Sequence, residues 1–168
     1  SDISEATVPA SVTIPANQTA VSFSIDAIDD SLLDGTQTVI ITGTASGYFE
    51  VTDTVDVTDF ETVTIAIAAA AIAENAGAAA TTATVTRSNT DTAAAVTVNL
   101  ASSDISEATV PASVTIPANQ AAVSFSIDAV DDALLDGTQT VTITGTASGY
   151  FEVTDTVDVT DFETVSIS

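Results

Sequence analysis

The chain has 168 residues, of which 24 are acidic and one is basic, and its formal net charge at pH 7 is −23. A chain with a single cation cannot neutralise phosphate groups, so the composition argues against a nucleic-acid partner and against an anionic membrane surface. Because 45% of the residues are hydrophobic, the chain has enough apolar material for a core, and the acidic excess does not indicate disorder.

The sequence contains a long internal repeat. Residues Ser1–Ala66 recur as Ser103–Ser168, displaced by 102 positions, with six of the 66 aligned positions different and every acidic residue retained. A repeat length of about 100 residues is the size of one small β-sandwich. Near-identical copies at this spacing predict a tandem array, which is typical of spacers rather than of enzymes.

Alternation of apolar and polar residues with period two predicts β-strands along the whole chain. Residues 1–59 are expected to hold the C-terminal part of one module, residues 60–161 a complete module, and residues 162–168 the first strand of a following module. The strands expected in the complete module are 62–72, 80–87, 94–101, 112–116, 121–129, 138–147 and 155–161. About seven short strands at this spacing predict an all-β fold, an immunoglobulin-like antiparallel β-sandwich.

Two parts of this interpretation have alternatives. The alanine-rich stretch 66–80 also suits a short helix, but the alternation of Val63, Ile65 and Ile67 favours a strand with a kink before Glu74. A module without its first three strands should not be stable alone. We therefore expect either that the natural chain continues on both sides or that neighbouring chains complete the partial module.

Carboxylates are predicted to gather at one end of the complete module. In an up-and-down sandwich the first, third, fifth and seventh strands all end at the same pole, and acidic residues follow each of them. These residues are Glu74, Asp104, Asp131, Asp132, Asp136, Asp161 and Glu163. All of them except Glu74 have counterparts in the first copy, which are Asp2, Asp29, Asp30, Asp34, Asp59 and Glu61.

Such a cluster needs a cation, because several unpaired carboxylates repel one another and no base is available to pair them. Calcium takes six to eight oxygen ligands in flexible geometry and suits loops of this kind. Glu107 is a weaker candidate for the same cluster. The alternative is a solvated acidic face, which we prefer for scattered acids such as Asp91, Asp128 and Asp158.

The complete module resembles a Calx-beta domain, a calcium-binding sandwich. The resemblance covers residues 60–161 and lies in Glu74-Asn75-Ala76-Gly77, in Asp131-Asp132 followed by Asp136-Gly137, and in the terminal Val159-Thr160-Asp161. It implies that Glu74, Asp104, Asp131, Asp132 and Asp161 bind calcium. The family often has three consecutive acids where this chain has two, and Phe162 interrupts its terminal acidic run. These departures imply fewer ions or weaker binding.

The resulting functional hypothesis is a non-enzymatic calcium-binding repeat. It would act as a calcium-rigidified stalk of a large extracellular bacterial surface or matrix protein, with adjacent repeats as its partners. The alternative is a filament subunit whose neighbouring identical chains complete each other. A sugar- or ice-binding module is less favoured, since Tyr48 and Tyr150 are the only large polar aromatics. An enzyme is least favoured, because the chain has no His, Cys or Lys.

Overall fold

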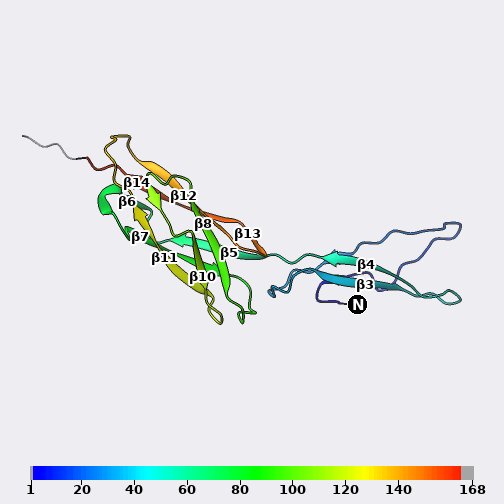
Figure 1. Cartoon of the computed structure of the whole chain (residues 1–168). Helices are drawn as coiled ribbons and strands as arrows, with labels where there is room; N and C mark the ends of the chain where they lie inside the picture. The colour runs from blue at the N-terminus through cyan, green and yellow to red at the C-terminus, as the bar shows by residue number, and fades with distance from the viewer. Residues whose placement is uncertain (1, 164–168) are drawn as a thin grey trace, which may run out of the picture. The chain divides into compact units, whose positions relative to one another are not determined.

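The computed structural model describes residues 2–163, and the chain divides into two compact units, Ser1–Phe60 and Glu61–Ser168 (Figure 1). The only helical segment among the described residues is the 3₁₀ turn η1, Glu74–Ala76, and it is far too short to cross a bilayer. The chain is thus all-β, as predicted. The expected strand in 162–168 falls mostly outside the described residues, and residues 161–163 are not in a strand.

The Glu61–Ser168 unit is a sandwich of two five-stranded sheets. The first sheet has the order β10-β8-β12-β14-β6, and the second has the order β13-β5-β7-β11-β9. The strands of the first sheet are β6 (Ala71–Ala73), β8 (Val96–Ser102), β10 (Ser113–Ile116), β12 (Gln139–Thr146) and β14 (Val153–Thr160). Those of the second are β5 (Glu61–Ile67), β7 (Thr81–Arg87), β9 (Ala108–Thr109), β11 (Ala122–Ala129) and β13 (Tyr150–Phe151).

The core lies between these sheets and is built by the alternation that predicted the strands. Val85 and Ile127 from one sheet are fully buried, and so are Val98, Val141 and Ile143 from the other. The polar residues between them face outward, as is usual for antiparallel sheets with one wet side. Six of the seven strands expected from the sequence are present with ends displaced by a few residues, and the remaining one, 62–72, is divided into β5 and β6.

The predicted first strand is split between the two sheets. β5 pairs with β7, whereas β6 pairs in parallel with β14, so the chain passes from one sheet to the other at residues 68–70. The Asp155 carboxylate accepts the Ile67 N–H, and the Ala70 carbonyl accepts the Asp158 N–H, so hydrogen bonds hold both sides of the crossing. The break thus comes earlier than the kink expected just before Glu74, and the competing helix is reduced to η1.

Strand connections also differ from the up-and-down arrangement that we assumed. Consecutive strands change sheets, and β12 lies between β8 and β14. The directions nevertheless agree with the prediction. β8 and β14 are both antiparallel to β12, β6 is parallel to β14, and β5 and β11 are both antiparallel to β7. The acidic loops therefore do follow strands that run the same way.

The Ser1–Phe60 unit forms fewer strands from nearly the same sequence. It contains two two-stranded sheets, β1 (Ala6–Thr7) with β2 (Asp26–Ala27) and β3 (Gln37–Gly43) with β4 (Val51–Val57). Residues 11–14 and 20–24, which correspond to β10 and the start of β11, are not strands here. In the other unit those strands pair with β8 and β7, and the Ser1–Phe60 unit has no counterpart of either.

Candidate metal centre

Two strand ends bring acidic side chains together at one pole of the Glu61–Ser168 unit. β6 and β14 are parallel and hydrogen-bonded, with Ala71–Ala73 beside Asp158–Thr160, so the residues that follow them emerge side by side. Carboxylate oxygens of Glu74, Asp161 and Glu163 all lie within 4.8 Å of one another. We call these three residues the acidic cluster.

The side chain of Glu74 is held in place by the backbone around it. It sits at the start of η1 and is only 2% exposed. Its Oε1 accepts the Phe162 N–H at 2.7 Å, and the Thr160 hydroxyl donates to the Ile72 carbonyl at 3.1 Å, which ties the end of β14 to β6. Gly77 ends the turn with a φ of 68°, a left-handed value that favours glycine. The predicted Glu-Asn-x-Gly turn therefore exists and aims its Glu inward.

Asp161 carries the most informative oxygen of the cluster. Its Oδ2 accepts the Gly137 N–H at 2.9 Å, which fixes the loop between β11 and β12. Its Oδ1 is buried and has no hydrogen-bond partner within residues 2–163. A buried carboxylate oxygen without a partner is costly in a folded protein, and a bound cation is one way to satisfy it.

Two buried glutamates, Glu74 and Glu107, have raised pKa values at this pole, where negative charge is concentrated. The Phe162 N–H lowers the pKa of Glu74, but burial and the charges of its acidic neighbours outweigh that bond, and the net shift is upward. Burial raises the pKa of Glu107, which is 6% exposed, and nearby carboxylates raise it further. The neighbours acting on one or both are Asp104, Asp131, Asp132, Asp136, Asp161 and Glu163.

The remaining predicted ligands of this unit thus surround the cluster without all joining it. Asp104 caps its own loop, because its Oδ1 accepts the N–H and hydroxyl of Ser106, and these bonds lower its pKa. Asp132 does the same for the Leu134 N–H at 2.7 Å. Asp131 and Asp136 are exposed. The most deeply buried of the peripheral acids is Glu107, which the sequence marked only as a weak candidate.

The first copy repeats the peripheral arrangement on a smaller scale. Glu5, the counterpart of Glu107, is 6% exposed, and burial raises its pKa, assisted by Asp34, Asp30, Asp2 and Asp59. Asp59 Oδ2 accepts the Asp34 N–H at 3.0 Å, much as Asp161 accepts Gly137. Asp29 is exposed. We did not single out Glu5 from the sequence, although it precedes an alanine that is buried in both copies.

Glu61 has surroundings unlike those of its repeat partner Glu163. It opens β5 in the Glu61–Ser168 unit, is 6% exposed, and accepts the Ser88 hydroxyl on Oε2. Its Oε1 is buried without a hydrogen-bond partner in the described part of the chain. Within this unit it does not lie in the acidic cluster, and its predicted metal role stays a prediction.

The single cation of the chain is not available to the cluster. Arg87 is 4% exposed, and its guanidinium donates to the carbonyl oxygens of Thr92, Ala94 and Gln120. The one base of the sequence is thus occupied with backbone carbonyl oxygens. The acidic cluster offers oxygen ligands, which hard cations such as Ca²⁺ prefer.

The electrostatics predict an unusual pH response of the metal-free chain. Between pH 4.5, the ordinary value for Glu, and the raised folded-state pKa values of Glu74 and Glu107, the folded state binds more protons than the unfolded state. Stability in EDTA should therefore rise as the pH falls through this window. Below about 3.8 it should fall again, because the lowered pKa of Asp104 acts in the opposite direction.

Urea-unfolding midpoints in EDTA at a series of pH values would measure this response. Protonation of the other carboxylates at lower pH also weakens the repulsion across the acidic chain and raises its stability. A variant is therefore needed to separate this general effect from that of Glu74 and Glu107. Glu107→Gln should be more stable than the parent at neutral pH and should have a flatter pH profile. An unchanged profile in that variant would show that Glu107 is not the source.

Comparison with protein-family profiles found no match, and comparison with curated protein sequences found none either. Among solved structures, the chain is similar to the crystal structure of the apo-form Calx CBD1 domain, with 16% identity and a TM-score of 0.46 over 61% of this chain and 100% of that domain. It is also similar to a family 2 glycosyl hydrolase from Bacteroides cellulosilyticus, with 9% identity and a TM-score of 0.45 over 82% of this chain and 18% of the hydrolase.

A third similar structure is the E. coli chaperone DraB, with 12% identity and a TM-score of 0.39 over 56% of this chain and 53% of the chaperone. All three TM-scores are below 0.5, so these likenesses assign no function. The β-sandwich implied by the Calx-beta resemblance is present in the structure. Membership of that family stays a prediction.

Proposed function

We propose that the Glu61–Ser168 unit binds Ca²⁺ at the acidic cluster and serves as a structural repeat without catalytic activity. The observation that carries the proposal is the buried, unpartnered Oδ1 of Asp161 beside the carboxylates of Glu74 and Glu163. A divalent cation there would satisfy that oxygen and offset the repulsion that raises the pKa of Glu74.

The position of the cluster suggests what binding would do. Glu74 belongs to the turn after β6, whereas Asp161 and Glu163 lie where the chain leaves β14. A cation held by all three would fasten the residues directly after β14 to the turn after β6. In a tandem array this would stiffen each junction, which is the basis for proposing a calcium-rigidified stalk.

The setting we propose is an extracellular bacterial surface or matrix protein, with adjacent repeats of the same chain as partners. Extracellular calcium modules bind with dissociation constants of about 10⁻⁴–10⁻³ M, and a site with three clustered carboxylates suits that range. The second candidate is a filament subunit completed by identical neighbours. Concentration-dependent sedimentation would detect it.

Calcium titration of the full chain tests the cation site. At a calcium concentration 100 times the dissociation constant, binding should stabilise the folded unit by about 2.7 kcal/mol, and melting should shift upward relative to EDTA. Asp161→Asn should abolish most of that shift, because it removes one charge and a ligand oxygen with little change of shape. Magnesium at the same concentration should act more weakly, since it requires stricter geometry.

Glu152→Gln is the matched control for charge. Glu152 is exposed and precedes β14, at the end of that strand away from Asp161. It should retain the full calcium shift. Equal shifts in Asp161→Asn and Glu152→Gln would refute the assigned site, and no shift in the parent chain would refute calcium binding altogether.

A further inference from the structure

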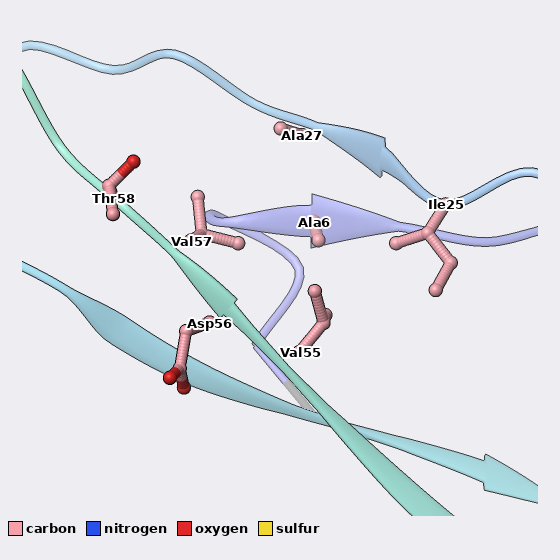
Figure 2. Close-up of a pocket in the computed structure, with 7 residues that line it drawn as sticks. All are labelled: Ala6, Ile25, Ala27, Val55, Asp56, Val57 and Thr58. Carbon is pink, nitrogen blue, oxygen red and sulfur yellow. The ribbon is translucent and has the colours of Figure 1, made fainter.

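The Ser1–Phe60 unit has an open, mainly apolar pocket at the position where the Glu61–Ser168 unit has a filled core. The pocket has a volume of about 260 Å³ and faces both short sheets of the unit (Figure 2). Its lining residues are Ala6, Ile25, Ala27, Val55, Asp56, Val57 and Thr58. At the matching positions of the Glu61–Ser168 unit, Ala108, Ile127, Val157 and Val159 are at most 1% exposed.

The Glu61–Ser168 unit shows which segments close this pocket. β6 pairs with Asp158–Thr160, the counterpart of Asp56–Thr58, and carries the buried Ile72. β7 begins opposite Ile127, the counterpart of Ile25, at the register pair Ile127↔Thr81. Both closing strands come from residues 61–102.

A second groove corresponds to the position of β8. It has a volume of about 810 Å³ and is lined by residues 8–12 on one side and residues 41–44 on the other, with Phe23 among its lining residues. In the Glu61–Ser168 unit the matching strands are β10 and β12, and β8 lies hydrogen-bonded between them. Val98 of β8 is completely buried there. The groove therefore lies at the position that β8 occupies in the Glu61–Ser168 unit.

Side-chain exposure agrees with the grooves. Phe23 is 45% exposed where Phe125 is 7% exposed, and Ile14 is 54% exposed where Ile116 is fully buried. The residues are identical in the two copies, so the difference lies in what covers them. In the Glu61–Ser168 unit the cover is again β7 and β8.

We propose that the Ser1–Phe60 unit is a docking surface for a polypeptide segment with the sequence pattern of residues 61–102. The segment adds strands equivalent to β5, β6, β7 and β8, fills both the pocket and the groove, and converts residues 11–14 and 20–24 into strands. The recognition is strand pairing combined with insertion of alternate apolar side chains into the grooves.

A second copy of this chain is not the occupant. Each copy has one segment 61–102, and that segment already covers its own Glu61–Ser168 unit, so donating it would uncover an equal surface. Two Ser1–Phe60 units would also repel each other, since residues 1–60 contain ten acids and no base. Residues 61–102 contain three acids, Glu61, Glu74 and Asp91, and one base, Arg87, for a net charge of −2. A segment of that near-neutral composition meets far less repulsion.

The test supplies the segment to the full chain. An extra copy of residues 61–102 is fused directly ahead of Ser1, and Phe23→Trp provides a single tryptophan, because the chain has none. All measurements are made in EDTA, so their outcome does not depend on calcium binding. Tryptophan emission should shift to shorter wavelength in the fusion, and the amides of residues 20–25 should become protected from hydrogen exchange. The same peptide added separately should give the same changes at a 1:1 ratio.

Two substitutions serve as controls on how the segment docks. A Cβ on Gly43 meets only Val51 Cγ2 at 3.4 Å, whereas a Cβ on Gly145 would lie 2.8 Å from Ile65 Cδ1 and 3.3 Å from Val98 Cγ1. Gly43→Ala should therefore be silent in the unfused chain but should reduce protection of residues 20–25 in the fusion by about tenfold. A fused segment carrying Val98→Asp should not dock at all.

Unchanged emission and exchange in the fusion would overturn the proposal. So would equal protection in the fusion with and without Gly43→Ala, because the segment would then not occupy the β5 and β8 positions. Concentration-dependent dimers of the unfused chain with a buried Trp at position 23 would show that a second copy is the occupant instead.

Discussion

Replacing Phe125 by alanine should lower the free energy of unfolding of the Glu61–Ser168 unit by about 3–5 kcal/mol. Phe125 lies on β11 opposite Ala83 of β7 and is 7% exposed, so it is enclosed by both sheets. Deleting the ring removes its buried apolar surface and leaves a cavity that the surrounding strands cannot fully close.

The repeat provides a matched control in the same molecule. Phe23 has the same sequence neighbours but is 45% exposed, so Phe23→Ala should cost about 1 kcal/mol or less. Urea unfolding by circular dichroism gives the midpoints, and hydrogen exchange of β7 amides assigns the loss to the Glu61–Ser168 unit. Equal losses for the two variants would mean that the core of that unit does not depend on the cover that β7 and β8 provide.

The two copies also show why the sequence predicted one module better than the other. Alternation identifies a strand by its own residues, and it located β7, β8, β11 and β12 within a few positions. A strand, however, forms only where a neighbour completes its hydrogen bonds. Residues 20–24 alternate as well as the start of β11 does, yet they remain irregular because no β7 lies beside them.

Hydrophobic periodicity could not predict where the chain crosses from one sheet to the other. Residues 66–71 contain five alanines, whose small side chains fit either face of a sheet and give no sign of where the chain changes sides. The position is set instead by partners far along the chain, the carboxylate of Asp155 and the amide of Asp158. Contacts at such a separation cannot be read from local sequence.

The candidate site was predictable in its location but not in its members. Strand direction alone placed Glu74 and Asp161 at the same pole, and the parallel pairing of β6 with β14 brings them together. Which acids are buried depends on the loops. The Asp104 carboxylate accepts a hydrogen bond from the Ser106 N–H in its own exposed loop, whereas Glu107, three residues later, is buried next to Ala108.

Replacing Arg87 by methionine should destabilise the Glu61–Ser168 unit by about 3–5 kcal/mol, an effect comparable to that of Phe125→Ala. Arg87 ends β7, and its guanidinium donates at 2.8 Å to Ala94, at 3.0 Å to Thr92, and at 2.9 and 2.6 Å to Gln120. Methionine fills part of the space but leaves these buried carbonyl oxygens without a donor. Loss of a buried charged donor is among the more costly single changes.

Arg87→Lys separates the hydrogen-bond geometry from the charge. Both residues keep the net charge at −23, whereas methionine makes it −24. A compact ammonium group cannot reach all three carbonyls that the guanidinium contacts along its different edges, so lysine should recover only about half of the stability lost with methionine. Full recovery by lysine, or recovery of the methionine variant in high salt, would mean that Arg87 acts by reducing the general repulsion of an acidic chain. Partial recovery that is insensitive to salt would instead show that the single base of the chain holds the loops after β7 and β10 against the sandwich, which explains why it does not pair with the acidic cluster.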